Sequence, residues 1–226
     1  MALTDDAILR IKDMIVRGEL KPGGKLPREP ELAELLGLSR NSLREAVRAL
    51  ALINILDVRQ GDGTYVTSLG PDRLLDTLNF VVDFHQDDSV LEFLRVRRIL
   101  EPEAAAMAAA RIDEETIATL DDLLEEANPD ASAEDLLKLD VEFHRCIGVA
   151  SGNSVLASLL DGLSAPTNRA RVWRGRTQTG AFERTQREHQ TILNALKARD
   201  PGYAHASMYV HVTGVENWLR QARDFI

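Results

Sequence analysis

A short turn between two short helical patterns is the feature that most constrains this chain. Residues 31–36 and 40–50 place leucines at helical spacing, and only Gly37, Leu38 and Ser39 separate them. Ser39 also suits the N-cap of the second helix, because its hydroxyl can accept a hydrogen bond from a free backbone N–H. Two helices joined by so tight a turn must pack against each other at a large angle. The pattern therefore predicts a helix-turn-helix.

The elements on either side extend this prediction. Residues 5–16 carry isoleucines at helical spacing and predict an amphipathic helix that ends before Gly18. After the third helix, residues 55–58 and 64–67 are β-prone and flank a glycine-rich turn at 60–63. We expect this hairpin to form a wing beside the helix-turn-helix.

From Pro71 onward the β-prone pattern stops and helical patterns follow one another. We place the boundary near Leu69 and Gly70, with a winged helix-turn-helix domain over 1–69 and an all-α bundle over 70–226. The fold class is thus mainly α, with one small β-hairpin. The expected helices of the bundle span 71–84, 89–110, 113–127, 133–150, 154–175, 180–198 and 201–223.

Charge is distributed unevenly between these two parts. The chain of 226 residues holds 27 Lys and Arg against 36 Asp and Glu, a net charge of -9. Residues 1–69 are balanced, so the whole excess of acid lies in the second part. Because an acidic surface repels nucleic acid, any DNA contact must come from a local basic surface, and Arg40 to Arg59 offers one.

The remaining composition excludes two classes of protein. Apolar runs are broken by charge before they could cross a membrane, and the N-terminus lacks a signal pattern, so we expect a cytoplasmic protein with no membrane partner. A single cysteine, Cys146, excludes an intrachain disulfide framework.

The helix that begins after Ser39 has the residues needed to read DNA. Arg40 and Arg44 are four residues apart and share the face opposite the buried leucines, so both can reach guanine edges or phosphates in the major groove. Alternatively, the arginines form a solvated face paired with nearby glutamates. The further candidates are Ser39, Asn41 and Ser42 for hydrogen bonds, and Gly61, Gly63 and Thr64 in the wing.

Residues 18–66 resemble the winged-helix domain of GntR-family bacterial transcription regulators. The resemblance rests on four motifs, which are Lys21-Pro22-Gly23, Leu26-Pro27, the helix start from Ser39 to Glu45, and Gly61-Asp62-Gly63-Thr64. It implies a homodimer on a palindromic operator, with Arg40, Arg44 and Gly61 at the DNA. Where the family commonly has arginine, this chain has Pro30, and Arg28 is a candidate to do the work of that arginine.

Three histidines and one aspartate lie at inward positions of the predicted bundle. Asp140 and His144 are four residues apart on one helix face, while His189 and His211 share faces with apolar residues of two other helices. One such histidine alone is more often a hydrogen-bonded core residue, but the four together favour a site for Zn, Ni, Mn, Fe or Co. His85 and His205 lack this pattern.

This set also resembles the FCD domain of the FadR-type branch of the GntR family, over about residues 72–219. The matching segments are 96–105, 140–144, 188–192 and His211. The resemblance implies a metal held by Asp140, His144, His189 and His211, with free positions facing a small carboxylate effector. Arg97 matches the pocket arginine of the family, although an ion pair with Glu101 is an equal alternative. Asn168 and Arg171 are further candidates for the effector pocket, and Arg95, where many relatives have Glu, is a departure.

The expected function is that of a ligand-responsive transcription regulator, a repressor that senses a small carboxylate at a metal centre. One alternative is a metal-free regulator that binds a larger apolar or acyl ligand, and another is a metal that only stabilises the fold. A metal-dependent enzyme is the third. We predict no enzyme, because Glu142 and Glu188 point about 160° and about 100° away from the neighbouring ligands on ideal helices.

Overall fold

The computed structural model describes residues 3–69 and 89–223, and these form two compact units. The first is a helix-turn-helix with a two-stranded hairpin, and the second is all-helical, so the predicted fold class is confirmed. The predicted domain boundary and the predicted helix over 71–84 involve residues outside the described ranges. Both stay predictions.

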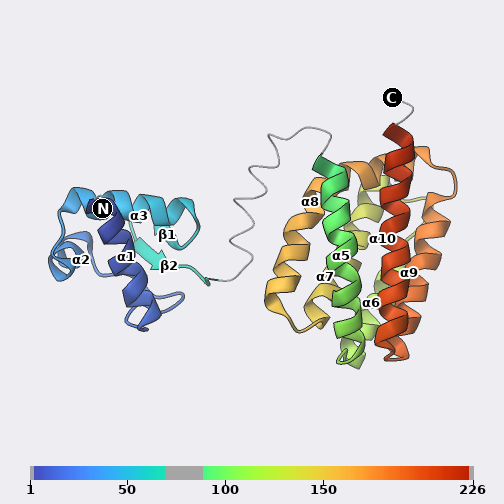
Figure 1. Cartoon of the computed structure of the whole chain (residues 1–226), viewed down its shortest axis with the longest axis horizontal. Coiled ribbons are helices and arrows are strands. Elements are labelled where there is room, and N and C mark those ends of the chain that lie inside the picture. Colours follow the sequence, from blue (N-terminus) through green and yellow to red (C-terminus); the bar gives the residue numbers. More distant parts are fainter. Residues whose placement is uncertain (1–2, 70–88, 224–226) are drawn as a thin grey trace. The chain divides into compact units, whose positions relative to one another are not determined.

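The N-terminal unit contains three helices followed by the hairpin (Figure 1). Its helices are α1 (Leu3–Val16), α2 (Glu29–Leu36) and α3 (Arg40–Leu52), and its strands are β1 (Leu56–Arg59) and β2 (Gly63–Val66). Leucines and alanines from all three helices meet Leu56 and Val66 of the hairpin in one apolar core. The core holds α3 by one face and leaves its opposite face in solvent.

Local chemistry fixes the turn between α2 and α3. Gly37 takes up a left-handed conformation with φ of 63°, which a residue without a side chain adopts at little cost. The Ser39 hydroxyl accepts a hydrogen bond from the backbone N–H of Ser42 at 3.1 Å and caps α3, as predicted. Helix α2 begins at Glu29, two residues earlier than predicted, because Pro30 fits the first turn, where no N–H is needed.

The hairpin is antiparallel, with Leu56 opposite Val66 and Arg59 opposite Gly63. Its strands are shifted by about one residue from the predicted runs. Lys25 adds a single bridge to Tyr65 on the other edge of β2. This third segment ties the wing to the chain that precedes α2.

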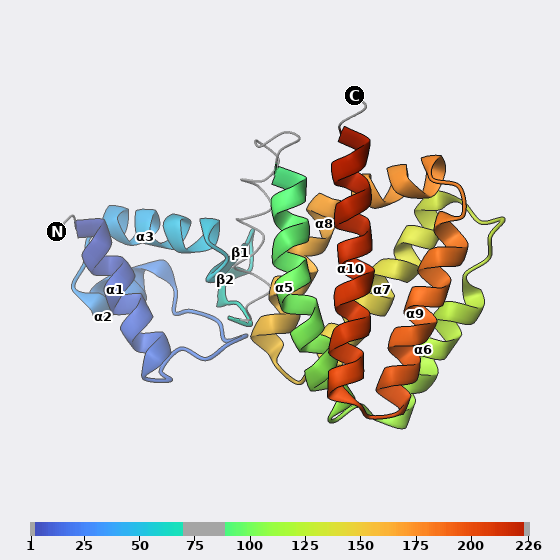
Figure 2. The same ribbon diagram turned by 45° about the vertical axis from the view of Figure 1, so that its right-hand side comes forward.

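The C-terminal unit contains six described helices. They are α5 (Ser89–Ala109), α6 (Glu114–Glu126), α7 (Ala133–Ala150), α8 (Ser154–Thr177), α9 (Ala181–Lys197) and α10 (Pro201–Arg223), within about two residues of the predicted spans. Helices α5 and α10 lie side by side in both views, and α9 follows beside α10 (Figure 2). Helices α7 and α8 pack against each other and against α5.

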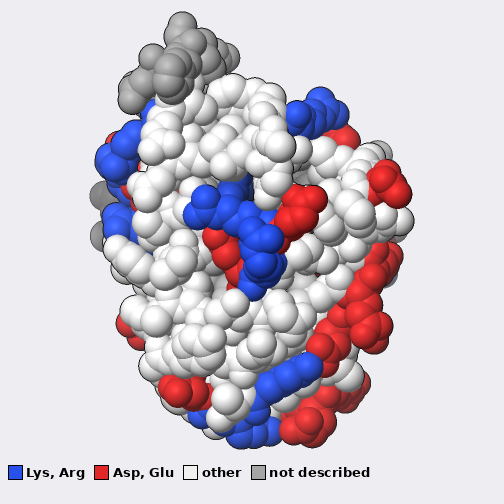
Figure 3. Space-filling view, turned by 90° about the vertical axis from the view of Figure 1, so that its right-hand side faces the viewer, with Lys and Arg blue, Asp and Glu red and all other residues white. Residues whose placement is uncertain are grey.

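Apolar residues of α5, α6, α7, α9 and α10 form the main core of this unit. Its surface carries the acidic excess, and acidic side chains follow one edge of the face in Figure 3. Within residues 3–69 and 89–223, each helix is too short or too polar to span a membrane.

Candidate metal centre and nucleic-acid interface

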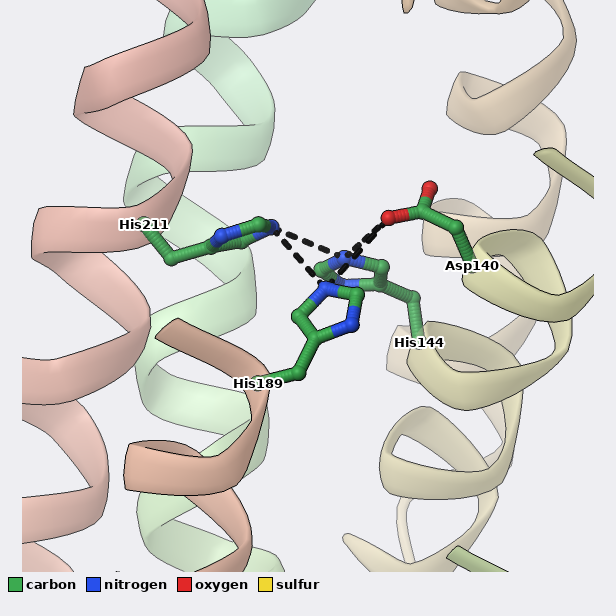
Figure 4. Close-up of side chains that lie close together, drawn as sticks. All are labelled: Asp140, His144, His189 and His211. Carbon is green, nitrogen blue, oxygen red and sulfur yellow. Dashed lines mark hydrogen bonds and ion pairs between the residues drawn. The ribbon is translucent and has the colours of Figure 1, made fainter. Parts of the chain in front are cut away.

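Four side chains from three helices of the C-terminal unit point at one another (Figure 4). Helix α7 supplies Asp140 and His144, α9 supplies His189, and α10 supplies His211. One ligand atom of each lies within 4.8 Å of all the others. The structure thus brings together the four residues that the sequence singled out, and this group could hold a metal.

Three of four separations between these atoms match those between ligands of one metal ion, and the fourth is wider. His211 Nε2 lies 3.2 Å from His144 Nε2 and 3.3 Å from His189 Nε2. Asp140 Oδ1 lies 3.3 Å from His189 Nε2 and 3.9 Å from His144 Nε2. Ligands about 2.1 Å from a metal are roughly 3.0 to 3.4 Å apart at right or tetrahedral angles. A shared cation therefore fits between these atoms.

Two carboxylates, one buried and one half-buried, orient the imidazole rings from behind. His211 Nδ1 donates to Glu188 Oε2 at 2.9 Å, and His144 Nδ1 lies 2.6 Å from Glu101 Oε2. A carboxylate at Nδ1 favours the tautomer with its proton there, so Nε2 keeps a free lone pair. The Nε2 lone pairs of His144 and His211 then face each other at 3.2 Å, which is unfavourable unless a cation lies between them. The donor set thus fits a metal.

The ligand-orienting role of these two glutamates is not among the predictions from sequence. Glu188 points away from His189 on its own helix, as predicted, but that direction brings it to His211 on α10. Glu101 is predicted only as a partner of Arg97. It does pair with Arg97, and its other oxygen faces His144. The sequence signals for these two roles were spacing alone: Glu101 lies four residues after Arg97, and Glu188 directly precedes His189.

Burial keeps His189 and His211 neutral, which is the form that binds a metal. His211 is buried and its pKa is lowered to about 3, mainly because burial penalises the charged ring. Burial, together with the neighbouring His144 and Arg171, also lowers the pKa of His189 well below its usual range. Glu188, in contrast, keeps its charge. Burial would raise its pKa, but hydrogen bonds from His211 and Arg184 outweigh this effect and lower the pKa to about 2.

A cavity of about 200 Å³ adjoins this cluster. Asp140, His144 and His211 lie in its wall, together with Arg97 and Arg171, two of the predicted effector residues. Both alternatives for Arg97 are present, since it lines the cavity and also pairs with Glu101. It donates a further hydrogen bond to Thr167 at 2.8 Å, and Arg171 forms an ion pair with Asp140.

The remaining effector candidate lies elsewhere in the same unit. Asn168 lines a second hollow with Leu137 and Trp173 and is not among the residues that line the cavity. Its role stays a prediction. In its place the cavity contains Arg174, which the sequence did not single out and which is 4% exposed. The sequence signal that could have indicated Arg174 is its position one helical turn after Arg171.

The predicted DNA-contacting residues of α3 lie on its solvent face. Arg40, Asn41 and Arg44 are exposed and Ser42 is half-buried, while Leu43 lies in the core. Arg44 Nε lies 2.8 Å from Glu29 of α2. The alternative of paired arginines therefore holds in the absence of DNA. Arg44 pairs with Glu29, which was not expected, and Arg48 pairs with the expected Glu45 at 2.8 Å.

The wing lies beside this face of α3. Arg44 and Thr64 line one hollow between the helix and the hairpin. Gly61 and Gly63 both have positive φ, 79° and 154°, so the tight tip depends on glycine. Asp62 at the tip accepts hydrogen bonds from Lys25 and Tyr65, each at 2.8 Å, and these bonds fix the wing.

Arg28 is the N-cap residue of α2 and is exposed. Its backbone N–H donates to Glu31 at 3.3 Å, which leaves the guanidinium in solvent. Whether it replaces the family arginine stays a prediction. His205 is partly exposed beside Glu103, and His85 lies outside the described residues.

The fold and the site together define a helix-turn-helix regulator with a helical sensor domain. Two family descriptions match the chain, namely "Bacterial regulatory proteins, gntR family" over residues 3–66 and the FCD domain over residues 92–214. The chain belongs to the GntR family of bacterial regulatory proteins and carries an FCD domain. Proteins of this family are DNA-binding transcription regulators and not enzymes, as predicted.

Relatives cover nearly the whole chain. The chain is 34% identical to the HTH-type transcriptional regulator LutR of Bacillus subtilis over 212 residues, which are 91% of this chain and 96% of LutR. It is 28% identical to the galactonate operon transcriptional repressor of Escherichia coli, over 96% of this chain and 97% of that protein. The solved structure of Streptococcus agalactiae GntR superposes with a TM-score of 0.70 at 31% identity and covers 95% of this chain and 99% of that one.

Proposed function

We propose that this regulator binds a divalent transition metal through Asp140, His144, His189 and His211, and that it senses a small carboxylate there. The observation that carries the proposal is the convergence of three histidine Nε2 atoms and one carboxylate oxygen at the wall of a cavity. Nitrogen and oxygen ligands suit Zn, Ni, Mn, Fe or Co, and supply in the cell decides among them. The metal would supply a Lewis-acidic position for an oxygen of the effector.

The cavity supports a small carboxylate rather than a large ligand. A cavity of about 150 Å³ holds a molecule of benzene's size, so one of about 200 Å³ suits a ligand of roughly six to ten heavy atoms better than an acyl thioester. The guanidinium groups of Arg97 and Arg171 match the planar geometry of a carboxylate. The relative from Escherichia coli is a repressor of a galactonate operon, and galactonate is a carboxylate.

For the DNA half, we propose a homodimer on a palindromic operator in the cytoplasm. Arg40 and Arg44, with Asn41 and Ser42, would enter the major groove, while the wing would contact the backbone through Gly61, Gly63 and Thr64. Ser39 would hold the start of α3, and Arg28 would act in place of the arginine that the family commonly has where this chain has Pro30. The effector would lower affinity for the operator by binding one arrangement of the dimer better than the other.

The test begins with metal content. Chelator-stripped full-length protein is reloaded with each candidate metal, and His189→Ala is compared with His205→Ala, a matched change at a partly exposed histidine. We expect one metal per chain in the natural protein and in His205→Ala, and a loss of at least about a hundredfold in affinity for His189→Ala. Equal metal binding by the two variants would refute the metal centre.

The second step measures DNA binding on an operator selected from random duplexes. We expect the response to a carboxylate effector to disappear when the metal is stripped and to return on reloading. If stripping lowers the melting temperature but leaves the effector response intact, the metal only stabilises the fold. On the DNA side, Arg44→Ala should weaken operator binding by about 1–3 kcal/mol.

A further inference from the structure

One positive charge in the cavity has no counter-charge. Arg174 lies on α8, three residues after Arg171, and its side chain is buried in the cavity wall. Its Nε donates to Gln178 at 2.7 Å, but its Nη2 is buried without a hydrogen-bond partner among the described residues. A buried guanidinium stays charged at neutral pH, so an unpaired one is costly.

The nearby charges are already paired with one another. Arg97 pairs with Glu101, and Arg171 pairs with Asp140. Glu188, the carboxylate with the largest effect on Arg174, pairs with Arg184 at 2.8 Å and accepts from His211. Burial lowers the pKa of Arg174, as expected for a charge without a close partner. Arg174 therefore forms no ion pair within the part of the chain that the structure describes.

The cavity as a whole also carries a surplus of positive charge. Three arginines and one carboxylate, Asp140, line the cavity, and Glu101 pairs with Arg97 from outside the lining. A bound divalent metal would add two further positive charges. A ligand with a single carboxylate would leave this surplus largely uncompensated. A ligand with two anionic groups would neutralise most of it.

Spacing and lining restrict the shape of such a ligand. Arg174 lies about 4.5 Å beyond Arg171 along the axis of α8, because residues three apart on a helix differ by that rise. Between the charged groups the wall is apolar, with Leu94, Leu136 and Val215 among its residues. The volume of about 200 Å³ leaves room for a short carbon chain only.

We propose that the effector is a small dicarboxylate, with one carboxylate at the metal and Arg97 and the second at Arg174. The inference rests on the proposed function, since it assumes that a carboxylate binds at the metal end. It adds a specificity-determining residue, Arg174, and excludes simple monocarboxylates as the preferred ligands.

The test uses two acids that share one end. L-Lactate and L-malate both present a 2-hydroxycarboxylate, but malate carries a second carboxylate where lactate has a methyl hydrogen. Calorimetry on metal-loaded full-length protein should show malate binding about ten to a hundred times more tightly, the range for a hydrogen bond to a charged group. Equal affinities would overturn the inference.

Variants of α8 locate the effect. Arg174→Gln should lower malate affinity to about the level of lactate and leave lactate affinity unchanged. It should also raise the melting temperature of the ligand-free protein, because it removes an unpaired buried charge. Arg176→Gln is the matched control, since Arg176 is exposed in the same last turn and pairs with Glu134. Equal losses for both acids in Arg174→Gln would overturn the inference.

Two further arms separate the possible failures. If neither acid binds although the metal is loaded, the proposed carboxylate sensing fails as well, whereas lactate binding without a preference for malate refutes only the dicarboxylate. 3-Phospho-D-glycerate is compared with D-lactate, because a phosphate could also pair with Arg174. If its gain over D-lactate exceeds the gain of malate over L-lactate, the second group is a phosphate and the dicarboxylate class is wrong.

Discussion

Replacing Glu101 by glutamine tests the claim that carboxylates prepare the histidines for metal. Glu101 is 3% exposed and lies between Arg97 on its own helix and His144 on α7. Burial alone would raise its pKa, but Arg97 and His144 hold the pKa of Glu101 well below the usual range. Glu101→Gln therefore removes a full negative charge at neutral pH and keeps the size of the side chain.

The glutamine can satisfy only one of its two neighbours. If its amide nitrogen faces His144, the imidazole must accept at Nδ1 and carry its proton on Nε2, where it cannot bind a metal. If its oxygen faces His144, its NH2 group faces the guanidinium of Arg97, which has only donors and is left without an acceptor. Loss of an outer-shell partner costs about ten to a hundredfold in metal affinity, or about 1.4 to 2.7 kcal/mol.

The same change should destabilise the metal-free protein. Breaking a buried pair costs about 3–5 kcal/mol, and the hydrogen bond that glutamine retains reduces this to about 2–3 kcal/mol. For a domain of this size the melting temperature should then fall by about 4–12 °C.

Metal affinity is measured by competition with a chromophoric chelator, and stability by calorimetry. The matched control is Glu103→Gln on the same helix, where the side chain is exposed and lies 3.4 Å from His205. We expect Glu103→Gln to behave like the natural protein. A Glu101→Gln protein that holds metal within about twofold of the natural affinity would contradict the tautomer argument.

Three further predictions concern stability. In metal-free protein the pKa of His211 is about 3, against about 6.5 when unfolded, so the unfolded chain takes up a proton that the folded chain does not. As the pH is lowered from about 6 to about 4, His211 should therefore reduce the free energy of unfolding by about 1.4 kcal/mol per pH unit. Urea unfolding at several pH values measures this slope, and His211→Gln should flatten it. Ser39→Ala should destabilise the winged helix by about 1 kcal/mol through loss of the α3 cap, and Ser132→Ala, which removes the cap of α7, should leave it unchanged. Gly37→Ala should cost about 1 kcal/mol because φ is positive there, and thermal unfolding should show a smaller loss for Gly37→Asn.

Secondary structure and short-range pairings could be predicted from the order of residues alone. The three-residue turn, the Ser39 cap and the glycine tip of the wing each depend on backbone geometry within a few residues, so a linear reading finds them. The spacing of Asp140 and His144 is equally local, because residues four apart always share a helix face. The inward positions of His189 and His211 on their own helices follow from the same spacing, and resemblance to the family then added Arg97.

The groups that face those residues from other helices became known only from the packing of the bundle. A helical wheel gives a direction around one axis, and the neighbour found in that direction depends on how the helices pack and rotate. For this reason Glu188 points away from His189 and yet holds His211, and Glu101 serves both Arg97 and His144. Packing likewise brought the charge of Arg174 into the cavity and directed Asn168 to a different hollow.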